Sequence, residues 1–203
     1  MLPRLTLLAL LCTLAFGCRT APQPGVRPVS DTRAYGSIGL SWTLRDGRSN
    51  DPLDEGESYH VEGGYVLWDG DERRFLGLEG ARVSFEGSLS FQRAEVNRVV
   101  NEVEEADIYR LGFGGRIEWD LESRPLTPYV RGGIYARTHR DQNLDFGEYD
   151  QDGRGIYIGT GAIWWYRPHA GIGPFLTIAR DLSSNELNET FFGLSLVIRA
   201  PGD

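Results

Sequence analysis

The stretch Tyr-Arg-Leu-Gly-Phe-Gly-Gly-Arg-Ile-Glu-Trp-Asp-Leu, residues 109–121, alternates at every position between two kinds of residue. One set is apolar apart from a glycine: Tyr109, Leu111, Phe113, Gly115, Ile117, Trp119 and Leu121. The other set is charged or glycine: Arg110, Gly112, Gly114, Arg116, Glu118 and Asp120. Because successive side chains of a β-strand point to opposite sides, this period of two predicts a strand with one apolar and one polar face.

The same alternation recurs on both sides of this stretch, and helical periodicity is nearly absent from the chain. In residues 81–92, for example, Val83 and Phe85 alternate with Arg82 and Glu86. The pattern predicts eight strands, at residues 34–45, 58–68, 73–92, 106–121, 127–139, 154–166, 171–181 and 190–199.

The predicted connections alternate in length along the chain. The first, third, fifth and seventh are long, at residues 46–57, 93–105, 140–153 and 182–189, and the others are short, at residues 69–72, 122–126 and 167–170. Long loops at one end and short turns at the other are typical of outer-membrane barrels. The sequence therefore predicts an all-β fold, an eight-stranded antiparallel up-and-down β-barrel of outer-membrane type, with both chain ends on the short-turn, periplasmic side.

The third connection contains four valines at helical spacing, at positions 96, 99, 100 and 103. They are consistent with a short loop helix or with an extension of the two flanking strands beyond the membrane, and the pattern does not choose between the two.

The composition of the two faces indicates which one points outward. The polar faces combine small residues with opposite charges, which suits the narrow interior of an eight-stranded barrel. We expect an interior charge network in which Arg82 pairs with Glu86, and Arg110 and Arg116 pair with Glu118 and Asp120. Aromatic residues near strand ends are expected to form interfacial girdles, and they are Trp42, Trp68, Trp119, Tyr129, Trp164, Trp165 and Tyr166. The alternative is a soluble, lipocalin-like barrel that binds an apolar ligand inside.

Several segments strengthen the membrane interpretation by resemblance. Residues 127–135, Thr-Pro-Tyr-Val-Arg-Gly-Gly-Ile-Tyr, and the strand and loop pattern of residues 34–199 resemble small outer-membrane barrels of the OmpA/OmpX type. Residues 193–198, Gly-Leu-Ser-Leu-Val-Ile, resemble the C-terminal signal read by barrel-assembly machinery, although no aromatic residue ends the chain. The resemblance implies a non-enzymatic barrel with a structural or adhesive role through external loops, and lipid and lipopolysaccharide as its surroundings.

The first residues are typical of an exported lipoprotein. Arg4 precedes an apolar run from Leu5 to Phe16, which is too short to span a bilayer as a helix and has the length of a signal-peptide core. Residues 14–18, Leu-Ala-Phe-Gly-Cys, resemble a bacterial lipobox, which implies lipidation of Cys18. We thus predict a signal peptide at 1–17, a lipidated N-terminus and flexible linker at 18–33, and a barrel domain at 34–203. An ordinary secretory signal with an incidental cysteine is the alternative.

Composition excludes other classes of function. The net charge of -8 argues against nucleic acid as a partner, because phosphate binding requires a basic face. Removal of the signal would leave Cys18 as the only cysteine, so neither an internal disulfide nor a cysteine metal site is expected. No cofactor is expected, and the protein partner is unknown. The acidic segment 141–152 weakly resembles a calcium-binding loop, because oxygen-bearing side chains occupy alternate positions in its first part. It lacks the usual glutamate ligand at the end of such a loop and has no predicted flanking helices.

One segment resembles the catalytic segment of outer-membrane lipid A deacylases. Those enzymes carry His-x-Ser-Asn before a late strand, and this chain has Leu182-Ser183-Ser184-Asn185. Leu182 stands where the resemblance requires the histidine. Since a serine without a base is a poor nucleophile, Glu189 would have no base to orient. We therefore expect no enzymatic activity, with lipid A deacylation as the alternative.

Overall fold

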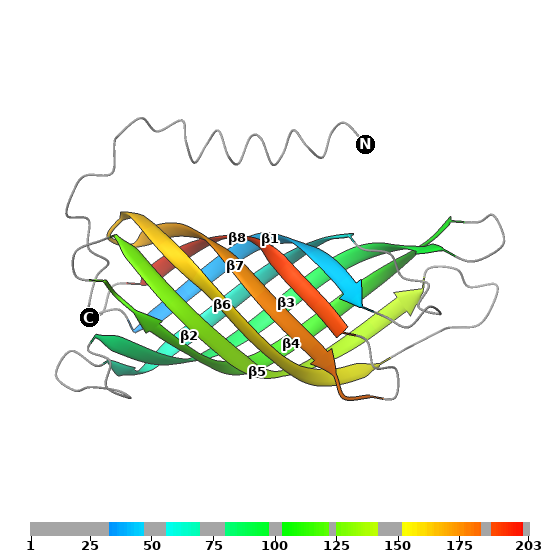
Figure 1. Ribbon diagram of the computed structural model, residues 1–203, viewed down its shortest axis with the longest axis horizontal. Coiled ribbons are helices and arrows are strands. Elements are labelled where there is room, and N and C mark those ends of the chain that lie inside the picture. The colour runs from blue at the N-terminus through cyan, green and yellow to red at the C-terminus, as the bar shows by residue number, and fades with distance from the viewer. Residues whose placement is uncertain are drawn as a thin grey trace.

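The computed structural model describes residues 33–46, 56–69, 80–97, 103–121, 125–141, 152–183 and 188–200. These form eight strands that close into a single antiparallel barrel in sequence order, with β1 also paired to β8 (Figure 1). The strands are β1 (Ala34–Asp46), β2 (Gly56–Asp69), β3 (Ala81–Asn97), β4 (Val103–Trp119), β5 (Leu126–Asp141), β6 (Gly153–Arg167), β7 (Ala170–Asp181) and β8 (Asn188–Ala200). Among the described residues, no helix is long and apolar enough to cross a membrane.

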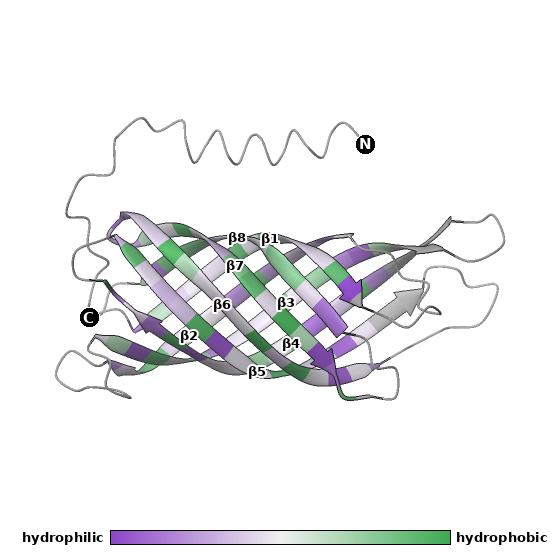
Figure 2. Ribbon diagram, viewed as in Figure 1, coloured by the Kyte–Doolittle hydropathy of each residue, from purple (hydrophilic) through white to green (hydrophobic). Residues whose placement is uncertain are grey.

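The alternation seen in residues 109–121 determines which side chains face outward. In β4, Leu111 and Phe113 are 47% and 46% exposed, whereas Arg110 and Arg116 are buried inside the barrel. Large exposed apolar side chains occur on all eight strands, and hydrophobic and hydrophilic positions are interspersed along the strands (Figure 2). Arginine and carboxylate side chains fill the interior instead. This inverted distribution confirms the prediction of an eight-stranded antiparallel barrel of outer-membrane type.

A β-bulge near the end of β2 changes which face its last residues use. The register between β2 and β3 shifts between Val66 and Trp68, so that Leu67 is the extra residue. After the shift, Asp69 lies opposite Arg82, and its carboxylate is 3.4 Å from the Arg82 Nε. The bulge therefore lets a carboxylate at the end of the barrel pair with an interior arginine, from a position that simple alternation would place outside.

Pro174 lies at an interruption of the ladder between β6 and β7. The pairs on either side are Phe175 with Gly161 and Ile172 with Trp164. Since proline has no backbone N–H, it cannot donate to a neighbouring strand. On its other side Pro174 still lies opposite Leu194 of β8, so the barrel closes without a break.

The strand boundaries correct the predicted alternation of loop lengths. The third strand begins at Ala81 rather than at residue 73, so the connection from β2 to β3 is longer than the predicted short turn. In contrast, β3 and β4 extend to Asn97 and Val103, which shortens the third connection. Of the two interpretations of the valines in residues 93–105, strand extension is correct at Val96 and Val103.

The predicted aromatic girdle is correct only in part. Trp42, Trp164 and Tyr166 are exposed on the outer wall, as expected for rings at a membrane interface. Tyr129 and Trp165 point into the barrel instead and are almost fully buried. Inside the barrel, Tyr129 stacks on Arg116 and Trp165 stacks on Arg199. A position near a strand end therefore does not determine whether an aromatic side chain points outward or into the barrel.

Candidate functional site

The charged interior of the barrel contains all six residues of the expected network. Arg82, Glu86, Arg110, Arg116 and Glu118 are buried, and Asp120 is partly exposed at the end of the barrel. We call this end, where Ala34 and Ala200 lie, the terminal rim; the opposite rim is the end at which β1 finishes and β8 begins. Along the barrel, the charges form three groups.

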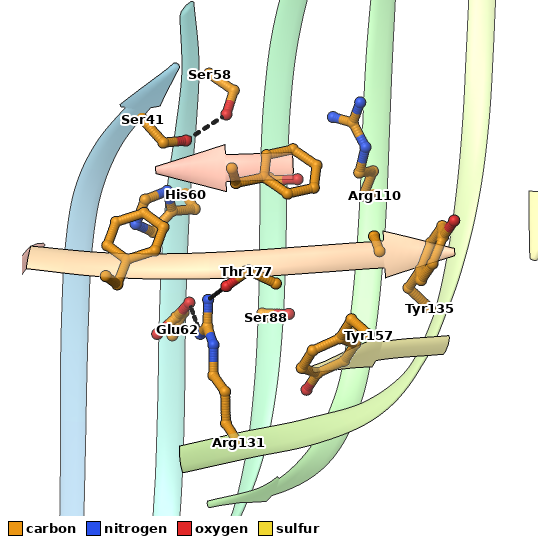
Figure 3. Close-up of a pocket in the computed structure, with 15 residues that line it drawn as sticks. Ser41, Ser58, His60, Glu62, Ser88, Arg110, Arg131, Tyr135, Tyr157 and Thr177 are labelled. Atoms are coloured by element: carbon orange, nitrogen blue, oxygen red, sulfur yellow. Dashed lines mark hydrogen bonds and ion pairs between the residues drawn. The ribbon is translucent and has the colours of Figure 1, made fainter. Parts of the chain in front are cut away.

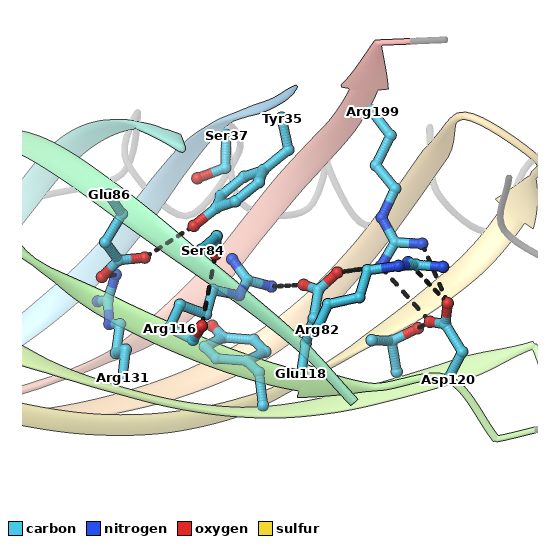
Figure 4. A network of polar contacts seen from close by, with 12 residues as sticks. Tyr35, Ser37, Arg82, Ser84, Glu86, Arg116, Glu118, Asp120, Arg131 and Arg199 are labelled. Carbon is cyan, nitrogen blue, oxygen red and sulfur yellow. Dashed lines mark hydrogen bonds and ion pairs between the residues drawn. The ribbon is translucent and has the colours of Figure 1, made fainter. Parts of the chain in front are cut away.

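The group nearest the terminal rim joins three arginines to two carboxylates (Figure 4). Arg82 Nη1 lies 2.7 Å from Asp120 Oδ2, and Arg116 Nη2 lies 3.2 Å from Glu118 Oε2. Arg199 of β8 bonds to Glu118 and closes the group across the barrel. Aromatic faces complete it: the guanidinium carbon of Arg116 lies 3.8 Å from the Tyr129 ring centroid, and that of Arg199 lies 4.3 Å from Trp165.

The middle group centres on two glutamates and one arginine. Arg131 forms an ion pair with Glu62 and also donates to the Thr177 hydroxyl at 2.8 Å. Glu86 accepts hydrogen bonds from Tyr35 at 3.0 Å and from Tyr157 at 3.3 Å. The two tyrosines come from β1 and β6, and Arg131 Nη1 of β5 lies 3.9 Å from Glu86 Oε1, so a carboxylate on β3 links strands on opposite sides of the barrel.

The group nearest the opposite rim is built around Glu189, whose side chain is fully buried. Arg110 donates to the Glu189 carboxylate from both Nε and Nη2, and the Nε to Oε2 distance is 2.8 Å. Arg45 Nε donates to the same carboxylate at 3.2 Å, and Arg137 Nη1 lies 4.0 Å away. Arg137 also donates to Asp181 at 2.9 Å.

The ion pairs differ from those expected, because partners come from across the barrel rather than from nearby positions in sequence. Arg82 pairs with Asp69, Glu118 and Asp120 rather than with Glu86. Arg110 pairs with Glu189, while Glu118 and Asp120 lie at the other end of β4. Only Arg116 has an expected partner, Glu118.

Sequence reasoning missed most of the residues that complete these groups. They are Arg45, Glu62, Asp69, Arg131, Arg137, Asp181, Glu189 and Arg199. All except Asp69 occupy inward positions by simple alternation, so the period of two could have identified them. The described interior thus balances seven arginines with seven carboxylates. They are Arg45, Arg82, Arg110, Arg116, Arg131, Arg137 and Arg199, with Glu62, Asp69, Glu86, Glu118, Asp120, Asp181 and Glu189.

A small cavity of about 70 Å³ separates the middle group from the group at the opposite rim (Figure 3). Its lining combines polar side chains such as Ser41, His60 and Arg131 with aromatic ones such as Phe175 and Phe191. A water molecule occupies about 30 Å³ in the liquid, so this space suits a few waters, whereas pockets for small organic ligands measure about 300–1,000 Å³. This cavity is therefore too small to hold the apolar ligand of a lipocalin-like barrel.

Among the described side chains, no histidine lies beside Glu189 as a lipid A deacylase would require. Glu189 is held by Arg110 inside the barrel and is unavailable to orient a base. Leu182 is exposed, and Ser183 donates to Asp181; Ser184 and Asn185 lie outside the described residues. Of the histidines with described side chains, His60 lines the interior cavity and His169 lies in the turn between β6 and β7 at the terminal rim.

The remaining candidates fall wholly or largely outside the described residues. Most of residues 141–152 and all of residues 1–32, including Cys18, are in this group. Asp152 accepts a hydrogen bond from Thr138 at 3.0 Å. Within the described part of the chain, no three His, Cys, Asp or Glu residues are grouped closely enough to hold a metal ion.

Comparison with known proteins identifies the architecture. No family model and no curated protein sequence matches this chain. Several solved structures match over most of the chain. Neisserial surface protein A has 12% identity and a TM-score of 0.60, covering 82% of this chain and 97% of that one. Ail, the attachment invasion locus protein of Yersinia pestis, solved with the heparin analogue sucrose octasulfate, has 10% identity and a TM-score of 0.57, covering 84% and 99%. Outer membrane protein OprG from Pseudomonas aeruginosa has 11% identity and a TM-score of 0.57, covering 87% and 100%. At these identities the likeness establishes the fold, which is that of small outer-membrane β-barrels.

Proposed function

We propose that this protein is an integral outer-membrane barrel without enzymatic activity, whose work is structural or adhesive and is done at the opposite rim. The observation that carries the proposal is the inverted wall, apolar outside and charged inside. In water, this many exposed apolar side chains would be an aggregation hazard. In a bilayer the same side chains contact lipid, and the closed ladder leaves no unpaired strand edge.

The filled interior supports a role at the rims rather than transport through the barrel. Three groups of ion pairs cross the lumen, and the cavity between two of them is small. Eight-stranded barrels are just wide enough for side chains to fill. The external loops joining β1 to β2, β3 to β4, β5 to β6 and β7 to β8 leave from the opposite rim, so they are the parts that would meet a partner.

The lipid-facing wall is tested with two cysteine variants at exposed positions, Phe113→Cys on the outer face of β4 and His169→Cys in the turn between β6 and β7. After fluorophore attachment and reconstitution in vesicles, we expect lipid-borne spin labels to quench the label at position 113 much more strongly than the label at position 169, because Phe113 lies on the apolar wall and His169 lies in a turn at the rim. The unmodified barrel should migrate differently in detergent gels before and after boiling. Loss of heat-modifiable migration, or equal quenching at both sites, would contradict a membrane barrel.

Lipidation of Cys18 is the second part of this proposal. The chain emerges at the terminal rim next to Ala34, and this rim would be periplasmic. Residues 18–33 between the cysteine and the barrel include three prolines and are suited to act as a tether. The acyl chains would then be a second attachment beside the barrel itself.

Cys18→Ser should abolish incorporation of a clickable palmitate analogue into the full chain, because the acyl group would have no thiol to join. We expect the variant to remain in the outer-membrane fraction, since the barrel supplies its own membrane contact. The matched control is Cys12→Ser, which lies in the predicted signal core and should leave labelling intact. Equal labelling of the wild type and the Cys18 variant would refute lipidation.

A further inference from the structure

Two arginines lie on the outer wall of the barrel close to the opposite rim. Arg180 of β7 is directly opposite Ile156 of β6, and Arg154 stands two positions from Ile156 on the same face. The two arginines are therefore diagonal neighbours, since β6 and β7 are adjacent strands (Figure 1). Diagonal Cα atoms in an antiparallel pair are about 7–8 Å apart, so their long side chains can reach a common point. Both are exposed.

These two arginines differ from the seven interior arginines and from Arg93 in lacking an acidic partner among the described residues; Arg167 at the other end of β6 also lacks one. All seven interior arginines pair with carboxylates, and exposed Arg93 on the outer face of β3 pairs with Asp107 at 3.1 Å. Within the described part of the chain, neither Arg154 nor Arg180 has a carboxylate within ion-pair distance. The neighbouring acids are engaged elsewhere: Asp181 accepts from Arg137 inside the barrel, and Asp152 accepts from Thr138.

An apolar column runs down the wall directly below the two arginines. It consists of Ile156 and Ile158 on β6 and Leu176 and Ile178 on β7, each between 42% and 66% exposed. The column lies on the face that the inverted wall turns toward lipid. Two cations above a strip of branched apolar side chains match a molecule with an anionic head and acyl chains.

We propose that Arg154 and Arg180 bind the phosphate of an anionic lipid in the outer leaflet, of the lipopolysaccharide class, whose acyl chains lie along this column. The inference rests on the proposed membrane location and names one lipid contact of that surface. Guanidinium groups donate paired hydrogen bonds to phosphate. A bound phosphate would also offset the repulsion between two neighbouring cations that have no ion-pair partner in the part of the chain that the structure describes.

The position on the wall favours a lipid headgroup over a dissolved phosphate. Arginine near a strand end can extend its head to the membrane surface while its stem stays on apolar surroundings. A dissolved anion would gain only the charge contacts, whereas a lipid also covers the exposed column. Binding should therefore require both the phosphate and the acyl chains.

The test uses the full refolded chain in zwitterionic detergent, titrated with purified diphosphorylated lipid A. We expect R154Q/R180Q to bind about tenfold more weakly than the wild type, because both phosphate donors are lost while the column stays. Enzymatic removal of the lipid phosphates should weaken wild-type binding by a similar factor and leave the double variant nearly unchanged. R93Q is the matched control, since Arg93 is an exposed outward arginine with an acid partner, and it should bind as the wild type does.

Equal affinity of the wild type and R154Q/R180Q for lipid A would overturn the proposal. Full competition by millimolar inorganic phosphate would also overturn it, because the site would then recognise the free anion alone. Heat-modifiable migration of each variant is measured in the same samples. If the variants show heat-modifiable migration and the affinities are equal, only this inference is wrong. If neither the wild type nor the variants show heat-modifiable migration, the proposed membrane location is wrong, and this inference is wrong as well.

Discussion

Replacing Glu189 with glutamine is expected to cost about 3–5 kcal/mol of folding free energy, the range for breaking a buried ion pair by removing one partner. Glu189 is fully buried and accepts from Arg110 and Arg45, with Arg137 within 4.0 Å. Glutamine has nearly the same shape but no charge. The substitution would remove the carboxylate that these arginines share, while Arg137 would keep its ion pair with Asp181.

The measurement is urea unfolding of the refolded barrel in lipid vesicles, followed by tryptophan fluorescence and gel migration. D107N is the matched control, because Asp107 pairs with Arg93, whose side chain is 54% exposed. Exposed pairs contribute about 0–1 kcal/mol, so the control should unfold close to the wild type. A Glu189→Gln barrel that unfolds at the same urea concentration as the control would show that the buried charges are solvated inside the lumen.

The sequence predicts the strands well because each strand carries its own signal. Alternation in residues 109–121 follows from the fact that one side of β4 faces lipid and the other faces the lumen. The seventh and eighth strands, predicted at 171–181 and 190–199, also agree with the structure within two residues at each end. Local periodicity is enough here, since the face of each residue depends only on its position in its own strand.

Partners inside the barrel could not be predicted in the same way, because they depend on register around the closed sheet. Arg110 on β4 forms an ion pair with Glu189 on β8, and the sequence of neither strand specifies this pairing. Asp69 shows a second cause: the bulge at Leu67 reverses the face of the residues after it, so alternation places Asp69 on the wrong side. Trp165 shows a third, since an aromatic ring serves equally well against lipid or stacked on the guanidinium of Arg199.

Gly133→Ala is expected to disrupt the pairing of β4 and β5 strongly, although it adds only one methyl group. A Cβ built on Gly133 of β5 would lie 2.1 Å from the backbone oxygen of Phe113 and 2.6 Å from the Cα of Gly114 on β4. These are backbone atoms in a paired strand, so no side-chain rotation relieves the overlap. Overpacking in a well-packed interior costs about 1–3 kcal/mol and occasionally more, and we expect the upper end or beyond because β4 itself must move.

The matched control is Gly63→Ala on the outer face of β2, where an added Cβ meets its nearest atom, the Tyr35 backbone oxygen, at an ordinary 3.8 Å. Both variants lower the flexibility of a strand glycine in the unfolded chain to the same degree, so their difference isolates the steric effect. Refolding yield into heat-modifiable barrel, and the urea midpoint of what folds, should fall sharply for Gly133→Ala and remain at or above wild type for Gly63→Ala. Equal yields and midpoints would mean that β4 and β5 can separate at this point without cost. The close approach of the two strands at Gly133 would then not be needed to close the barrel around its charged interior.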